Sequence, residues 1–256
     1  IKRNQLIDLE ITAVAFGGKG IAKIATEKGD YVLFVPNTIK GQKVRARVVK
    51  RKSSFAECKL VEVLEKSPDE VVLPYQAISG APYATLPIEI QHKNKQEQVF
   101  DIYKKLAKLP NVEELFDEYI GSPENWHYRN KMEYSFSAIG FDVEKQEEFD
   151  GFALGFKKRG TWWIVENLEK DSGLFDAEFE NKLREIRLFC EKSGLPAWHP
   201  PKKEGFFRFL VVRKSYQTGK LLIKLVTSSD GLDKFDFDDF VVLLNQLFSD
   251  RIEGII

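Results

Sequence analysis

The first 65 residues contain short strands and turns without a helical period, and no other feature constrains the fold as much. Apolar residues alternate with polar ones in two stretches, at Leu9, Ile11 and Ala13 and at Val44, Ala46 and Val48. Apolar runs at 31–35 and 55–64 add further strands. A sheet of five short strands has few ways to cover its edges, so we predict an OB-like five-stranded β-barrel over residues 1–68.

The rest of the chain has a mixed pattern, and the whole is predicted to be α+β. Ser67–Asp69 interrupts the strands, and residues 69–110 follow as an extended linker and a helix from Ile88 to Leu109, which Pro110 ends. Residues 111–256 form a mixed central α/β domain. Strands are expected at 131–137, 153–156, 162–165, 206–213 and 220–227, and helices after the N-cap Asp176 and at 237–248.

The charge of the chain is balanced overall but uneven along its length. It carries 39 Lys and Arg and 39 Asp and Glu, whereas nucleic-acid-binding domains usually show a basic surplus. Residues 1–70, however, hold 14 Lys and Arg against nine Asp and Glu, and the stretch 230–239 is acidic. A local basic surplus at the start of the chain therefore keeps a nucleic-acid partner open.

Cysteine and histidine usage excludes several kinds of site. Cys58 and Cys190 are too few for a disulfide framework, which favours a reducing cytoplasm. His92, His127 and His199 lie in separate segments, so we predict no metal site. No stretch approaches the roughly 20 apolar residues of a membrane span, and no membrane partner is expected.

Gly17–Gly20 resembles a phosphate-binding loop only superficially. Such a loop leads into a helix that presents its amide groups to the phosphate, whereas a strand follows here. We predict a hairpin turn whose glycines supply positive φ, with Lys19 at its tip able to reach a phosphate.

The densest basic run lies on a predicted barrel strand, at Arg45, Arg47, Lys50 and Arg51. Alternation would place Arg45 and Arg47 together on the solvent face. Exposed strands are often charged for solubility alone, and that interpretation stays open. Small barrels bind nucleic acids through one face and its loops, so these four cations are candidate RNA-binding residues.

The segment 126–134 combines aromatic rings, two cations and an amide within nine residues. Stacking rings with guanidinium and amide donors suit unpaired RNA bases and backbone. The alternative is that Tyr128 and Tyr134 are core aromatics and Arg129 an internal salt-bridge partner. The candidate RNA-binding residues of this segment are His127, Tyr128, Arg129, Asn130 and Lys131.

Taken in order, these landmarks resemble the uridine-C5 RNA methyltransferases, which modify tRNA or ribosomal RNA with S-adenosylmethionine. The N-terminal part is similar to a TRAM domain at Gly17–Ala22, Phe34–Pro36, Ile39–Gly41, Val44, Lys50 and Ser67–Pro68. The central part is similar at Gln91, Lys95, His127–Lys131, Leu154–Phe156, Val211–Arg213 and Leu225–Thr227. The resemblance implies RNA as the partner and S-adenosylmethionine as the cofactor.

One departure from the family concerns its iron–sulfur cluster. Many members bind a four-iron cluster through cysteines between the barrel and the helix, but the matching stretch 74–83 contains no cysteine. Thiolates are the ligands that such a cluster needs. The resemblance therefore implies a cluster-free branch, in which Tyr75 and Tyr83 pack where the cluster would lie.

A second departure concerns catalysis. In the family, the methyl-donor loop, the catalytic cysteine and the general base lie in a C-terminal Rossmann-like domain, which would also bind S-adenosylmethionine. The chain begins without Met and ends on what resembles the opening of a buried strand, so we expect both ends to be cut and that domain to be missing. No catalytic residue is predicted in this chain, which alone should be inactive. Cys58 and Cys190 are expected to be small buried apolar groups.

The leading hypothesis is the RNA-recognition portion of an S-adenosylmethionine-dependent RNA (uracil-C5)-methyltransferase that acts on rRNA or tRNA. The strand Tyr128–Lys131 and the cations Arg208 and Arg213 would line the path toward the active site. One alternative is a stand-alone RNA-binding or chaperone module without catalysis. Another is a protein-binding adaptor with Trp162, Trp163 and Phe206 as hot spots. We expect a monomer.

Overall fold

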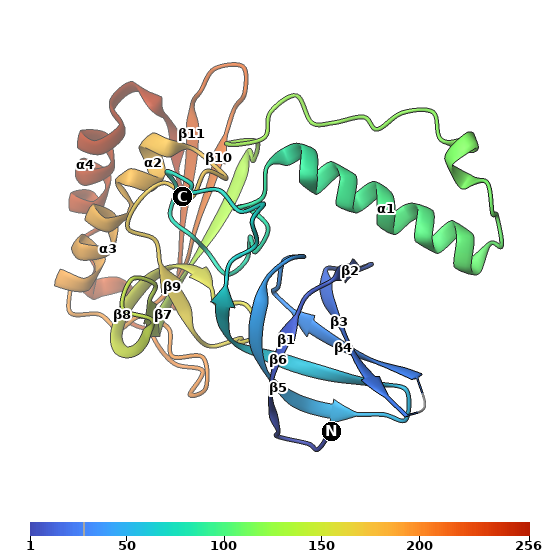
Figure 1. Cartoon of the computed structure of the whole chain (residues 1–256). Coiled ribbons are helices and arrows are strands. Elements are labelled where there is room, and N and C mark those ends of the chain that lie inside the picture. Colours follow the sequence, from blue (N-terminus) through green and yellow to red (C-terminus); the bar gives the residue numbers. More distant parts are fainter. Residues whose placement is uncertain (28) are drawn as a thin grey trace. The chain divides into compact units, whose positions relative to one another are not determined.

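The chain divides into two compact units in the computed structural model, which describes residues 1–27 and 29–256 (Figure 1). Unit 1 comprises residues 1–73 and 82–123, and unit 2 comprises residues 74–81 and 124–256. Each unit has a hydrophobic core of its own. None of the described helices has the length and apolar character that a membrane span requires.

Unit 1 contains a β-barrel. Its strands are β1 (Leu6–Glu10), β2 (Ala13–Ala15), β3 (Lys19–Thr26), β4 (Gly29–Pro36), β5 (Lys43–Arg51) and β6 (Phe55–Glu65), in the order β1-β5-β6-β4-β3-β2. The strands at the two ends of this order, β1 and β2, follow each other directly in the chain. β1 pairs with β5 and β2 pairs with β3, so the sheet closes on itself.

The prediction of five strands is wrong, because a bend divides the first strand in two. At this bend the Ile11 amide donates to the Gln42 carbonyl and the Thr12 amide to the Ile21 carbonyl, each at 2.9 Å. One stretch of chain thereby changes partners from β5 to β3. Alternation of apolar residues predicts the strand but not the bend, because Ile11 is fully buried at the bend and the alternation is not interrupted there.

The barrel core follows the predicted alternation. The fully buried side chains include Ile11, Leu33, Val35, Val44, Ala46 and Val48. The predicted glycine hairpin is confirmed, since β2 pairs antiparallel with β3 and Gly17 and Gly18 have φ of 86° and 80°. L-residues with a Cβ rarely adopt such values, so the turn requires glycine here.

A long helix, α1 (Ile88–Leu106), follows the barrel and none of its residues is buried. The predicted helix is confirmed, although it ends three residues early, before Lys108, whose φ of 58° is left-handed. A 3₁₀ turn, η1 (Val112–Leu115), comes next.

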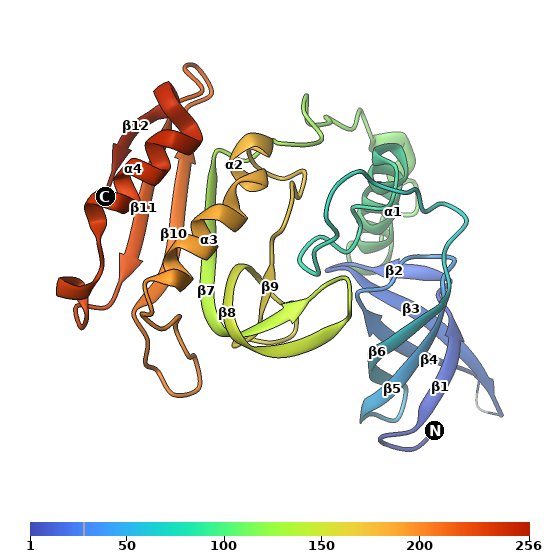
Figure 2. The same ribbon diagram turned by 90° about the vertical axis from the view of Figure 1, so that its left-hand side faces the viewer.

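Unit 2 is a six-stranded sheet with helices on one face (Figure 2). The strands are β7 (Lys131–Asp142), β8 (Glu147–Lys157), β9 (Val165–Asn167), β10 (Phe207–Lys214), β11 (Leu221–Thr227) and β12 (Ile252–Ile255), in the order β12-β11-β10-β7-β8-β9. The helices are α2 (Ala177–Asn181), α3 (Leu183–Lys192) and α4 (Phe237–Phe248), with 3₁₀ turns η2 (Leu232–Lys234) and η3 (Ser249–Arg251). The strand expected at 162–165 is misplaced, since β9 begins only at Val165.

The core of unit 2 is rich in phenylalanine and lies between the sheet and the helices. Phe206 is only 1% exposed, so its predicted role as an exposed hot spot is wrong. It belongs to the core because the bridge Ala197–Phe207 draws the start of β10 against the preceding loop. Cys58 and Cys190 are buried as predicted, and burial raises the pKa of the Cys58 thiol to about 11.

Candidate nucleic-acid interface

The segment 127–131 has a backbone fixed by its neighbours in unit 2. On one side, the His127 amide donates to the Gly173 carbonyl at 2.7 Å, and the Arg129 amide donates to the Leu174 carbonyl at 3.1 Å. On the other side, the Lys214 amide donates to the Asn130 carbonyl at 2.8 Å. The segment is therefore positioned by two separate parts of the chain.

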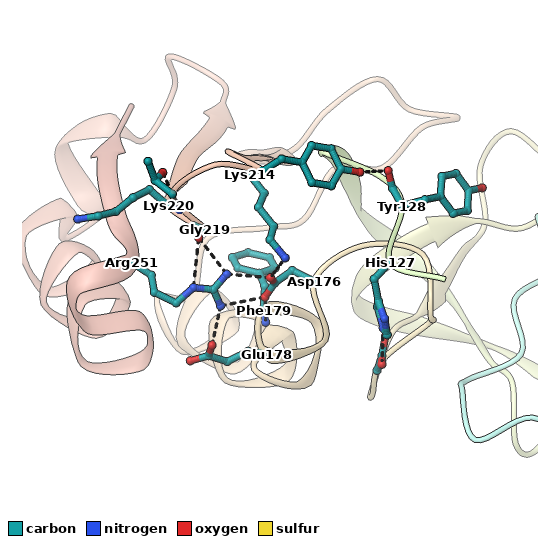
Figure 3. Close-up of polar contacts among 12 residues, drawn as sticks. His127, Tyr128, Asp176, Glu178, Phe179, Lys214, Gly219, Lys220 and Arg251 are labelled. Carbon is teal, nitrogen blue, oxygen red and sulfur yellow. Dashed lines mark hydrogen bonds and ion pairs between the residues drawn. The ribbon is translucent and has the colours of Figure 1, made fainter. Parts of the chain in front are cut away.

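The hairpin of β10 and β11 supplies a further contact to the same segment. The Tyr216 hydroxyl donates to the Tyr128 carbonyl (Figure 3). Lys214, two residues before Tyr216, makes the backbone contact to Asn130 and also pairs through its ammonium with Asp176. The hairpin thus connects the candidate segment to the N-terminus of α2.

His127 has an internal role. Its φ of 53° is left-handed, which is uncommon for a residue with a side chain. Its Nε2 lies 2.9 Å from Oδ2 of Asp171, and its ring packs edge-on against Tyr75 with centroids 5.5 Å apart. These contacts direct the imidazole toward the protein, so His127 positions the residues that follow it.

The four side chains that follow His127 are exposed, which sets them apart from the internal neighbours Met132 and Tyr134. Tyr128 is 45% exposed, and the Arg129 guanidinium carbon lies 5.8 Å from the centre of its ring. Arg129 forms no ion pair with another described residue, which disfavours the alternative of an internal salt bridge. Tyr134 is a core residue, as that alternative held.

Asp176 is the centre of a charged cluster with Lys214 and Arg251 (Figure 3). Its carboxylate is 2.8 Å from Nη2 of Arg251 and 2.7 Å from Nζ of Lys214, and it also accepts from the Phe179 amide at 3.0 Å, which confirms the predicted N-cap. Arg251 also donates to the Gly219 carbonyl at the hairpin turn. Burial alone would raise the pKa of Asp176, but the hydrogen bonds from Arg251 and Lys214 outweigh it and hold that pKa well below its usual range.

The two candidate cations of β10 are placed differently. Arg213 is exposed and lies directly opposite Lys131 in the β7–β10 ladder, so these two cations adjoin each other. Arg208 lies at the other end of β10, beside a register shift, with its guanidinium carbon 4.1 Å from the Trp198 ring centre. Its Nε is buried and has no hydrogen-bond partner among the described residues.

The candidate cations of the barrel lie along β5 and at the start of β3. Arg45 is neutralised, because its guanidinium donates to both oxygens of Asp8 at 2.8 and 2.9 Å. This pairing lowers the pKa of Asp8 and raises that of Arg45. Arg47, Lys50, Arg51 and Lys19 are exposed. Arg45 is thus occupied by Asp8, whereas the exposure of the other four cations agrees both with a strand charged for solubility and with the predicted contact to RNA.

The residues that hold the segment were not all visible in the sequence. Gly173 has φ of 75°, and a Cβ there would lie 2.7 Å from Trp126 and 2.8 Å from Tyr75, so only glycine allows this approach. Asp171 lies 44 positions from its partner His127. The sequence Asp171–Ser172–Gly173 is typical of a turn, but nothing in a single sequence indicates which distant residue this turn contacts.

No group of three or more His, Cys, Asp and Glu side chains in the described parts of the chain could hold a metal ion. The two tyrosines expected at the cluster position lie in different units. Tyr75 packs on Trp126 with ring centroids 4.6 Å apart, and Tyr83 donates its hydroxyl to the Gly18 carbonyl at 2.6 Å. That both tyrosines pack where the cluster would lie stays a prediction.

Comparison with known proteins gives consistent matches. The TRAM domain family matches residues 2–61. The chain is 32% identical to an uncharacterized RNA methyltransferase of Caldanaerobacter subterraneus, over 99% of this chain and 53% of the relative. It is 30% identical to one from Clostridium acetobutylicum, over 100% of this chain and 53% of the relative. The chain thus spans about half the length of the curated relatives it matches.

A solved structure matches in fold. The Pyrococcus abyssi tRNA (uracil-54, C5)-methyltransferase, in complex with S-adenosyl-L-homocysteine, aligns with a TM-score of 0.53 and 20% identity. The alignment covers 88% of this chain and 50% of that chain.

The expected fold, a chain whose Rossmann-like domain is missing, is corrected by these matches. They pair 99% of the chain with an RNA methyltransferase in sequence and 88% with another in structure. The chain is therefore similar to such enzymes along almost its whole length, and neither a loss of a domain nor inactivity follows from where it begins and ends.

Proposed function

We propose that this chain, which matches the TRAM domain family at residues 2–61 and resembles RNA methyltransferases along its length, recognises rRNA or tRNA in the cytoplasm for S-adenosylmethionine-dependent methylation at C5 of a uridine. The uracil-C5 specificity is carried over from the solved relative, whose name states a tRNA uracil as its substrate. RNA recognition is the part of this proposal that the described residues support.

The observation that carries the proposal is the segment 128–131. Its backbone is fixed on both sides, whereas its side chains expose a tyrosine ring, a guanidinium, an amide and an ammonium. A fixed backbone lowers the conformational entropy that binding of these side chains costs. The chemistry suits RNA, because rings stack on unpaired bases and cations contact phosphates.

Two places in the described residues, the Gly17–Gly20 turn and the start of α4, lack the features of a site for S-adenosylmethionine. A Rossmann-like sheet binds such a cofactor at a glycine-rich turn between a strand and a helix. Gly17–Gly20 lies in a β-hairpin, and the N-terminus of α4 in the β11–α4–β12 crossover is occupied by Asp236, which accepts from the Asp239 amide at 2.9 Å. No step of methyl transfer is assigned to these residues.

The test is a titration of the chain with folded tRNA and with an rRNA stem-loop at several salt concentrations. The Arg129→Ala/Lys131→Ala variant should bind about tenfold or more weakly, and its log–log salt slope should fall by roughly one unit for each phosphate that it no longer neutralises. Arg184→Ala/Lys192→Ala is the matched control, because it removes one exposed arginine and one exposed lysine from α3, outside the segment. Equal affinities for the two variants would contradict the proposal.

A further inference from the structure

The sheet of unit 2 has a second face, opposite its helices. The helix-covered face is formed by Met132, Tyr134, Leu210, Val212 and Ile223, all buried in the core of the unit. Because strand residues alternate between faces, the residues between them point the other way. We call this second surface the open sheet face, and its members are Lys131, Glu133, Lys157, Phe209, Val211, Arg213, Leu222, Lys224 and Val226.

The register of the strands places these residues in rows. Val211 lies between Glu133 on β7 and Lys224 on β11, and the next row places Arg213 between Lys131 and Leu222. Neighbours in such rows lie roughly 5 Å apart, so their side chains form one surface.

The centre of the open sheet face is apolar and partly accessible. Phe209, Val211 and Val226 are half-buried, and Leu222 is 37% exposed. The Lys157 ammonium lies 5.8 Å from the Phe209 ring centre. An aromatic ring that remains partly accessible beside aliphatic side chains offers a stacking surface for a flat group.

The rim of the open sheet face is positively charged. It carries the cations Lys131, Lys157, Arg213 and Lys224 against a single carboxylate, Glu133, which lies 3.7 Å from the Lys131 ammonium. Arg213 and Lys224 are exposed and form no ion pair with another residue among those described. The surplus of about three positive charges therefore faces solvent around an apolar centre.

We propose that the open sheet face binds an unpaired RNA strand, with bases on Phe209 and Val211 and phosphates on Arg213 and Lys224. The proposal rests on the RNA-binding function proposed above and specifies the form of RNA that the sheet takes. An unpaired strand fits, because its bases are free to stack on a ring while its phosphates contact cations. In a duplex the bases are stacked inside the helix, so none is available to stack on the Phe209 ring.

Charge argues against a second copy of the chain as the occupant. Two open sheet faces in contact would bring their cationic rims together, and like charges in an interface cost several kcal/mol. An acidic protein could form ion pairs with the cations of the rim, but its binding would not require an aromatic ring at the centre. The ring and the cations together favour RNA.

The test uses fluorescence anisotropy with a labelled 12-nucleotide single-stranded RNA and with its duplex. Phe209→Leu keeps an apolar side chain but removes the stacking ring, and should weaken single-strand binding about tenfold with an unchanged salt slope. Lys224→Ala should lower the magnitude of the slope by about 0.7. Leu188→Ala and Lys192→Ala on α3 are the matched controls, and circular dichroism melts establish that every variant is folded.

The possible results separate this proposal from the one it rests on. If tRNA binding depends on Arg129 and Lys131 but single-strand affinity is unchanged in Phe209→Leu and Lys224→Ala, the open sheet face is refuted and the proposed function stands. If the wild-type chain binds no RNA at low salt, both are wrong. If polyglutamate competes equally well and only Lys224→Ala matters, the face binds acidic protein and this proposal fails.

Discussion

Asp176 illustrates how one side chain can stabilise several elements. It caps α2, pairs with Lys214 at the end of β10, and pairs with Arg251 before β12. The carboxylate is 6% exposed and its partners are 20–25% exposed, so water screens these pairs only in part. Removal of the carboxylate would leave two cations close together without compensation, which is the costly way to break a buried pair.

We therefore predict that Asp176→Asn lowers the free energy of unfolding by about 3 kcal/mol at pH 7. Because the folded-state pKa of Asp176 lies below its unfolded value, its stabilisation is present above about pH 4 and is lost as pH falls toward the folded pKa. The difference between wild type and variant should shrink from pH 5 to pH 2 in urea titrations. A difference independent of pH would show that the ion pairs are not its source.

At the scale of elements, α1 stands out, because it has 19 residues and buries none of them. Its contacts include the stacking of His92 on Tyr119, with ring centroids 4.4 Å apart, an edge-on packing of Phe100 on Phe116 at 5.3 Å, and the exposed pair of Lys104 and Glu113. Most helical stability in proteins comes from packing of an apolar face, and exposed ion pairs add little.

We expect the amides of α1 to exchange with deuterium at least 100-fold faster than those of β7, whose alternate residues lie in the core of unit 2. Hydrogen exchange followed by mass spectrometry measures both in one experiment. Protection of α1 equal to that of β7 would mean that another surface covers the helix in solution.

The elements with a regular period were predictable from the sequence, and those defined by distant contacts were not. The alternation in β5 and the helical spacing in α4 follow from local apolar patterns. The bend after β1 and the burial of Phe206 depend on partners far along the chain. In the candidate site, the segment His127–Lys131 was identified by composition, but its support by Asp171 and Gly173 required knowledge of which loop lies beside it.

At the scale of the whole molecule, the chain builds two cores that share no residue. The barrel core contains Leu33 and Val44, and the core of unit 2 contains Tyr134 and Leu210. Residues 74–81 belong to unit 2 although residues on both sides of them belong to unit 1, so the chain passes between the units three times. Connections of this kind join two cores without merging them.

Separate cores predict separate loss of structure. Leu33→Ala removes a fully buried side chain from the barrel and should cost about 2–5 kcal/mol there, because it reduces apolar burial and leaves a cavity. Hydrogen exchange of the variant should increase in β3 to β6 and stay unchanged in β7 and β10. Leu210→Ala, the matched change in the other core, should have the opposite pattern. Loss of protection in both units from either substitution would show that the two cores unfold as one cooperative structure.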